Sequence, residues 1–183
     1  MTLPDGAFEP DSRAEWRAWL EARHDTEKGV WLVLRKKSAS PVNLSVDDAV
    51  EEALCFGWID STEKKIDHER FAQKFSPRKP NSKWSELNKE RARRMIESGK
   101  MTEVGFAKLG NVLEQTFEIP ADILKALKAD EQTWENFQQF PDIYQRIRIG
   151  YIEEVRKRPD DFNKRLSHFL KMTAQNKKFG TIQ

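Results

Sequence analysis

Residues 46–76 read VDDAVEEALCFGWIDSTEKKIDHERFAQKFS, and their pattern changes from helical to extended at a single glycine. A serine precedes the stretch, and serine is a favourable helix cap, so we predict a helix over residues 46–56 that ends at Gly57. Residues 58–66 and 70–76 favour two strands joined by a turn, because apolar and polar residues alternate in the second one. This segment predicts a helix followed directly by two joined strands.

The residues before this segment add one helix and one strand. Ser12 and Glu15 form the spacing of a capping box, which predicts a helix that ends near His24. Residues 29–37, GVWLVLRKK, are apolar and β-favouring and predict a third strand. We therefore predict an α+β domain over residues 1–82 with a small three-stranded sheet.

The residues after Trp84 carry almost only helical patterns. We predict connecting helices over residues 83–118, an all-helical C-terminal part over 119–183, and a loose tail from residue 177. The predicted helices cover residues 84–98, 103–114, a short segment from Pro120, 131–139, 141–158, and a last one marked by Phe162, Leu166 and Phe169. The predicted fold class is α+β.

Composition excludes several classes of protein. The 183 residues include one cysteine and three widely spaced histidines, which excludes an internal disulfide framework and a zinc finger. No apolar run approaches the roughly 20 residues that span a bilayer. Residues 1–10 lack the apolar core of a signal peptide. We expect a cytoplasmic protein without a membrane span, a metal or a cofactor.

Positive charge is concentrated in residues 70–100, which hold ten Lys and Arg against three Asp and Glu. Such a surplus favours an anionic partner, and it is equally consistent with a solvated face. Nucleic acid is one such partner, with Phe71, Phe75 and Trp84 available for stacking. We disfavour it, because the isoelectric point of about 8.6 is modest and nucleic-acid-binding motifs are absent.

Polar residues interrupt the apolar stripe of the predicted helix over residues 84–98. Asn88 lies in the middle of that stripe with Arg91, and Ser85 lies at its edge. Polar groups on a core-facing stripe must be paired or face a cavity. Two interpretations stay open: a buried hydrogen-bond network, or a pocket in which Asn88 orients a ligand and Arg91 or Arg78 binds an anion.

The start of the strand after Gly57 carries a further candidate. Asp60 lies near the mouth of the sheet, where it would accept from a ligand or pair with Arg78 or Lys64. Cys55 lies opposite the apolar stripe of its helix, and no histidine is near it in sequence, so we favour a packed thiol over a nucleophile. The acidic residues of the same helix are interpreted as its exposed face near the N-terminus, where the helix dipole favours them: Asp47, Asp48, Glu51 and Glu52.

Residues 52–60, EALCFGWID, resemble the signature segment of the YdeI/OmpD-associated family, also called bacteriocin-protection proteins. Further blocks within residues 70–105 are similar to the family, among them FSPR at 75–78 and WS at 84–85, and residues 119–178 are similar to its helical domain. The resemblance covers nearly the whole chain. It implies no reaction or ligand, and it points to stress or envelope physiology rather than to a location.

The family blocks retain the polar residues that the helical pattern selects. Our leading hypothesis is a polar pocket between the two parts that binds a small anionic ligand. Its predicted contacts are Asp60, Arg78, Ser85 and Asn88, with Trp58 and Trp84 as walls. The alternative is a protein-interaction module formed by residues 119–183, whose aromatic residues also fit a helical core: Trp134, Phe137, Phe140 and Tyr144. No nucleophile is identified, so no reaction is predicted.

Overall fold

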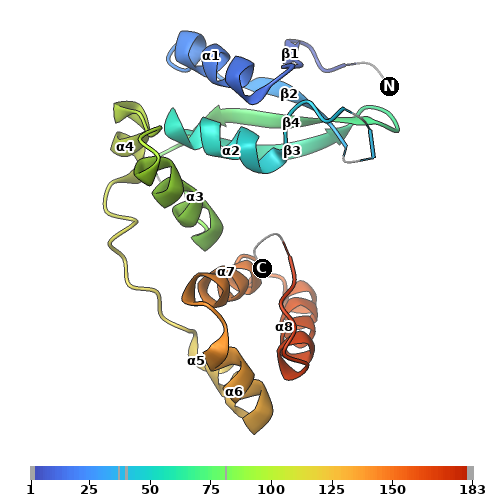
Figure 1. The fold of residues 1–183 in the computed structure, drawn as a ribbon, viewed down its shortest axis with the longest axis vertical. Coiled ribbons are helices and arrows are strands. Elements are labelled where there is room, and N and C mark those ends of the chain that lie inside the picture. The colour runs from blue at the N-terminus through green and yellow to red at the C-terminus, as the bar shows by residue number, and fades with distance from the viewer. Residues whose placement is uncertain (1–2, 37, 40, 81, 181–183) are drawn as a thin grey trace. The chain divides into compact units, whose positions relative to one another are not determined.

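The computed structural model describes residues 3–36, 38–39, 41–80 and 82–180. Contacts divide the chain into two compact units (Figure 1). The first unit comprises Met1–Ser82 and Arg91–Leu113, and the second comprises Lys83–Glu90 and Glu114–Gln183. The domain boundaries expected from the sequence, at residues 82 and 118, stay predictions.

A four-stranded sheet with helices forms the first unit. Its strand order is β1-β2-β4-β3, with β1 parallel to β2 and the other pairs antiparallel. The elements in chain order are β1 (Ala7–Phe8), α1 (Arg13–Arg23), β2 (Val30–Arg35), α2 (Val46–Cys55), β3 (Trp58–Lys65), β4 (Arg70–Pro77), the larger part of α3 (Glu86–Glu97), and α4 (Glu103–Leu109). The three predicted strands are confirmed, but a sheet of three strands is wrong, because β1 adds a fourth. Two residues are too few to show an alternating pattern.

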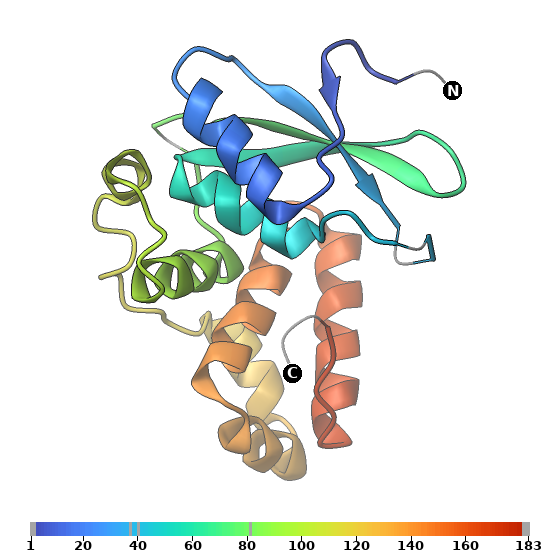
Figure 2. The same ribbon diagram turned by 45° about the horizontal axis from the view of Figure 1, so that its top comes forward.

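Helices α1 and α2 lie side by side over the sheet (Figure 2). Trp16 of α1 is fully buried, and its indole Nε1 donates to the carbonyl oxygen of Ala49 in α2 at 3.0 Å. The Trp16 ring also packs against Phe75 of β4, with ring centroids 5.4 Å apart. One side chain therefore joins two helices and the central part of the sheet.

Helix α4 packs on the C-terminal end of α2. The Thr102 hydroxyl accepts from the Gly105 amide and so caps the N-terminus of α4. The same hydroxyl donates to the Cys55 carbonyl oxygen and so satisfies the end of α2. Gly105 lies so close that a Cβ there would be 2.3 Å from the same oxygen. The approach of α4 to α2 therefore requires glycine at this position.

The second unit is helical, as predicted. It contains α5 (Ala121–Lys128), α6 (Glu131–Gln139), α7 (Asp142–Glu153), α8 (Pro159–Ala174) and the first residues of α3. Helices α4 and α7 end several residues before the predicted ends at 114 and 158. Pro159 begins α8 at its first turn, where a missing amide hydrogen has no cost. None of the described helices is long and apolar enough to cross a membrane.

Aromatic and aliphatic side chains together form the core of the second unit. Three of the four aromatic residues considered as an interaction surface, Phe137, Phe140 and Tyr144, are buried in this core, and Trp134 packs partly against it. Phe179 also packs there, and its backbone amide donates to the Tyr144 hydroxyl at 3.1 Å. The prediction of a loose tail is therefore wrong at Phe179, and residues 181–183 lie outside the described part.

Candidate functional site

A β-bulge near the start of β3 positions the first candidate residue. Asp60 pairs with Phe75 and Glu63 pairs with Gln73, so β3 holds one more residue than β4 between these pairs. Bulges redirect neighbouring side chains. Here Gln73 Nε2 donates to Asp60 Oδ2 at 3.1 Å, which holds the carboxylate on the side of the sheet that Phe75 also faces.

Two arginines act on this carboxylate. Arg78 follows β4 and is only 4% exposed, and its backbone amide donates to the Gly57 carbonyl oxygen at 2.8 Å. Arg91 of α3 is 8% exposed and forms an ion pair with Asp47. We call Asp60, Gln73, Arg78 and Arg91 the polar cluster. Every member lies in the first unit.

Burial dominates the electrostatics of the polar cluster. It lowers the pKa of Arg78 to about 10, against the opposing charge of Asp60. It also raises the pKa of Asp60, against the charges of Arg91 and Arg78 and the hydrogen bond from Gln73. Both shifts express the cost of charge in a poorly solvated place. An anion bound near the two guanidinium groups would be attracted there with little screening by water.

The other predicted residues occupy different surroundings. Trp58 is 1% exposed, and its indole Nε1 donates to the His24 carbonyl oxygen at 3.0 Å, so it belongs to the core of the first unit. Ser85 Oγ accepts from the backbone amide of Asn88 at 3.2 Å near the start of α3, within the second unit. Trp84 and Ser85 line a cavity of about 410 Å³ in that unit, whose other polar lining residues are Lys83, Glu86, Glu153 and Glu154.

The structure thus brings the predicted residues together in two groups. Asp60 and Arg78 are electrostatic neighbours in the first unit, and Trp84, Ser85 and Asn88 lie close in sequence and space in the second. The Lys64 partner considered for Asp60 instead lies over the ring of Trp31, with its Nζ 4.5 Å from the ring centroid.

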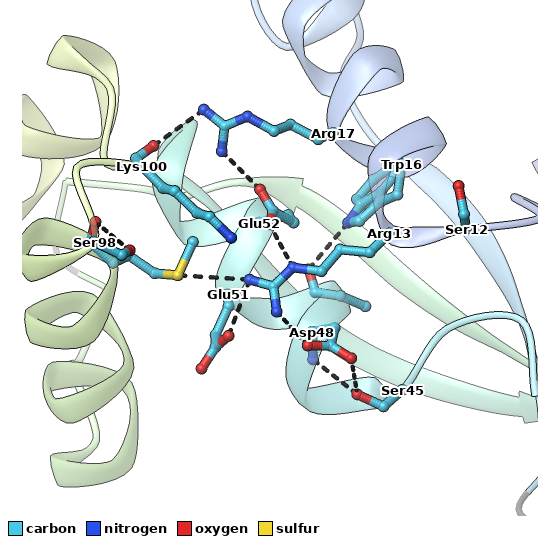
Figure 3. A network of polar contacts seen from close by, with 12 residues as sticks. Ser12, Arg13, Trp16, Arg17, Ser45, Asp48, Glu51, Glu52, Ser98 and Lys100 are labelled. Atoms are coloured by element: carbon cyan, nitrogen blue, oxygen red, sulfur yellow. Dashed lines mark hydrogen bonds and ion pairs between the residues drawn. The ribbon is translucent and has the colours of Figure 1, made fainter.

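Three acidic residues of α2, Asp48, Glu51 and Glu52, form an ion-pair network with α1 that the sequence did not reveal (Figure 3). Glu52 accepts from Arg13 Nε at 2.6 Å and from Arg17 Nη1 at 2.7 Å, while Arg13 also pairs with Asp48 and Glu51. Glu52 is 1% exposed, so its interpretation as part of an exposed helix face is wrong. The spacing of Arg13 and Arg17, four residues apart on one helix face, is the signal that would have indicated it.

One of the three residues considered for stacking on nucleic-acid bases is not accessible. Phe75 is fully buried under Trp16, so it presents no ring to a base. Arg70, in the same basic stretch, pairs with Asp67 and Glu9 at 2.9 and 3.2 Å. Within the described part of the chain, no group of three or more histidine, cysteine, aspartate or glutamate side chains is arranged to hold a metal ion.

The Cys55 thiol is buried. Its burial and the nearby charge of Glu52 raise its pKa to about 11. Only the thiolate reacts with alkylating agents, so the folded protein should hold this group protonated and shielded at neutral pH. We expect iodoacetamide at pH 7.5 to leave Cys55 unmodified in the native protein and to modify it fully in urea, as measured by intact mass. Rapid alkylation without urea would contradict the packed-thiol interpretation.

Comparison with known families divides the chain near the same place as its contacts do. Residues 8–108, more than half of the chain, match a domain of unknown function, DUF8412. Residues 116–176 match the OmdA family, described as bacteriocin-protection, YdeI or OmpD-associated. The chain belongs to the DUF8412 family and carries an OmdA domain. No curated protein and no solved structure matches it.

The OmdA match confirms the family suggested by the sequence. It falls on α5 to α8, whereas residues 52–60 and the blocks at 70–105 lie in the DUF8412 match. The polar cluster therefore belongs to the DUF8412 domain, and the aromatic core of the second unit belongs to the OmdA domain.

Proposed function

We propose that the protein binds a small anionic ligand through the polar cluster of its DUF8412 domain. The observation that carries the proposal is that two nearly buried guanidinium groups, Arg78 and Arg91, lie within electrostatic reach of the Asp60 carboxylate. Arginine offers a planar fork of donors that matches a carboxylate or phosphate. In the proposal, Arg78 binds the anion and Asp60 accepts from a ligand donor.

The proposed ligand contacts are those of the polar cluster. Trp84, Ser85 and Asn88 lie in the second unit, and the Trp58 indole is buried in the core of the first, so these four residues stay outside the proposed site. The proposed compartment is the cytoplasm, and a role in stress physiology fits the description of the OmdA family as bacteriocin-protection. No reaction is proposed, because no nucleophile is identified: the Cys55 thiol, which was considered from the sequence, is held protonated.

A thermal-shift screen against nucleotides, sugar phosphates, carboxylates and metal ions tests this proposal. A ligand at about 100 times its dissociation constant stabilises a fold by roughly 2.7 kcal/mol. We expect an anionic compound to raise the melting temperature, and Arg78→Lys to abolish the shift, because lysine keeps the charge but loses the fork. Lys79→Ala is the matched control, since it removes an exposed cation next to Arg78.

The outcomes separate the proposal from its alternative. A shift that survives in Arg78→Lys would reject the residue assignment. A flat screen with every variant folded would reject ligand binding at the polar cluster. That second result would favour the alternative, a protein-interaction module. The test of the alternative is whether the full chain captures a partner protein through residues 119–183.

A further inference from the structure

A second cavity lies in the second unit, apart from the polar cluster. Its volume is about 450 Å³, which falls in the usual range for small-molecule sites. Side chains of α7, α8 and the segment after α8 line it. Its basic and aromatic lining residues include Arg148, Tyr151, Lys164, Arg165, His168 and Phe179.

Arg148 is the unusual residue of this cavity. It is 7% exposed, and its Nε is fully buried without a hydrogen-bond partner. Among the residues that the structure describes, none forms an ion pair with it. Its guanidinium group is surrounded by aromatic rings instead, with centroids of Tyr144, Tyr151 and Phe179 at 5.7, 5.7 and 5.3 Å. A buried charge without an ion pair is costly, so the presence of an arginine at this place needs a reason.

The surrounding charges leave the cavity basic. Its one lining carboxylate, Asp161, forms an ion pair with Arg158 at 3.0 Å. Arg165 donates to the Tyr151 carbonyl oxygen. Its Nη1 also forms an ion pair with Glu154 Oε2 at 3.8 Å. Lys164, like Arg148, has no carboxylate within ion-pair distance among the described residues. Among the described residues, Arg148 and Lys164 therefore face the cavity without an ion pair, and the charge of Glu154 acts on Arg148 only from beyond ion-pair distance.

The aromatic walls are held in place by other contacts. Arg165 lies over the Tyr151 ring, 3.6 Å from its centroid. Phe179 is fixed by its amide hydrogen bond to Tyr144 and by the His168 ring, whose centroid is 4.6 Å away. Gly180 lies against the guanidinium group, and a Cβ there would be 2.3 Å from Arg148 Nη1. The segment after α8 thus closes one side of the cavity.

We propose that this cavity binds a small molecule with a phosphate or carboxylate head and a flat apolar part. Arg148 pairs with the head through its fork of donors, and Lys164 at the rim adds a second positive charge. Tyr151 and Phe179 pack against the flat part. This site is separate from the polar cluster, because it lies entirely in the second unit.

Isothermal titration of the full chain with phenyl phosphate, benzoate, inorganic phosphate and benzylamine tests the proposal. We expect phenyl phosphate or benzoate to bind with a dissociation constant of about 1 mM or lower. The stronger of the two identifies the head group. Inorganic phosphate should bind more weakly because it lacks the flat part, and benzylamine should not bind because its charge is positive.

Variants locate the binding. Arg148→Gln should weaken it at least tenfold, since a charge-assisted hydrogen bond is lost. Arg156→Gln is the matched control: it removes an arginine of the same unit that pairs with Asp122 and Glu153 outside the cavity, and it should bind as the unchanged protein does. Arg78→Lys should also bind normally, which separates this site from the polar cluster.

Lys164→Gln keeps the test decisive if Arg148→Gln does not fold. Lys164 is exposed on α8, so its replacement should preserve the fold and weaken binding about threefold. Equal affinity in Arg148→Gln or, if that variant is unfolded, in Lys164→Gln would overturn the proposal. So would the absence of binding of both aromatic anions at about 10 mM.

Discussion

Glu52→Ala is expected to lower the free energy of unfolding of the first unit by about 3–5 kcal/mol, the usual cost of removing one partner of a buried ion pair. The Glu52 side chain is 2% exposed and accepts from both Arg13 and Arg17. Burial alone would lower the pKa of each arginine, yet the hydrogen bonds and charge of Glu52 raise both above the ordinary value. Without Glu52, the two guanidinium groups keep their desolvation cost and lose their main partner.

Urea denaturation followed by tryptophan fluorescence measures this loss, because four of the six tryptophans lie in the first unit. Glu21→Ala is the matched control. Glu21 also pairs with Arg17, at 3.2 Å, but its side chain is 57% exposed. An exposed pair of this kind contributes about 0.3–0.5 kcal/mol. Similar losses in the two variants would show that burial does not set the strength of the network.

Gly105→Ala is expected to destabilise the same unit by about 3 kcal/mol, at the upper end of the range for overpacking. In an open helix the substitution would instead stabilise by about 1 kcal/mol, because alanine is the better helix former. Here the added Cβ would be 2.3 Å from the Cys55 carbonyl oxygen and 2.5 Å from Met101 Sδ. The oxygen belongs to the backbone at the end of α2, so α4 must move away.

Ala107→Gly on the same short helix isolates the effect of helix propensity. Ala107 is exposed, so this variant should lose only about 1 kcal/mol. The Thr102 hydrogen bond to Cys55 should weaken in Gly105→Ala and persist in Ala107→Gly. Faster iodoacetamide modification of Cys55 in Gly105→Ala alone would report that opening. An unchanged midpoint in Gly105→Ala would show that α4 adapts without loss.

Local signals made much of the fold predictable from the sequence. Ser12, Ser45 and Gly57 mark helix ends by capping and by a positive φ, which act within a few residues, and the structure has them in these roles. β1 was missed because its two residues gain their extended form from pairing with β2, a contact that no local pattern encodes.

Charged residues were harder to interpret than apolar ones. Glu52 looked like a solvated residue because its partners lie 35 and 39 residues away on α1. Arg148 gave no signal at all, since it stands among the polar residues of an amphipathic helix, and only the packing of Phe179 and Gly180 against it reveals its burial. Arg78, one of the two partners considered for Asp60, lies within electrostatic reach of it, whereas the role of both residues stays a prediction.

The contact between α4 and α2 determines how late in synthesis the first unit can complete its fold. The β3–β4 hairpin is complete once residue 77 has left the ribosome, but the cap on the Cys55 carbonyl needs Thr102 and Gly105. Residues 83–90, which belong to the second unit, emerge in between. A nascent chain therefore holds its sheet with one helix end unsatisfied until α4 follows, and the last residues of the first unit leave the ribosome just before the first residues of the OmdA domain.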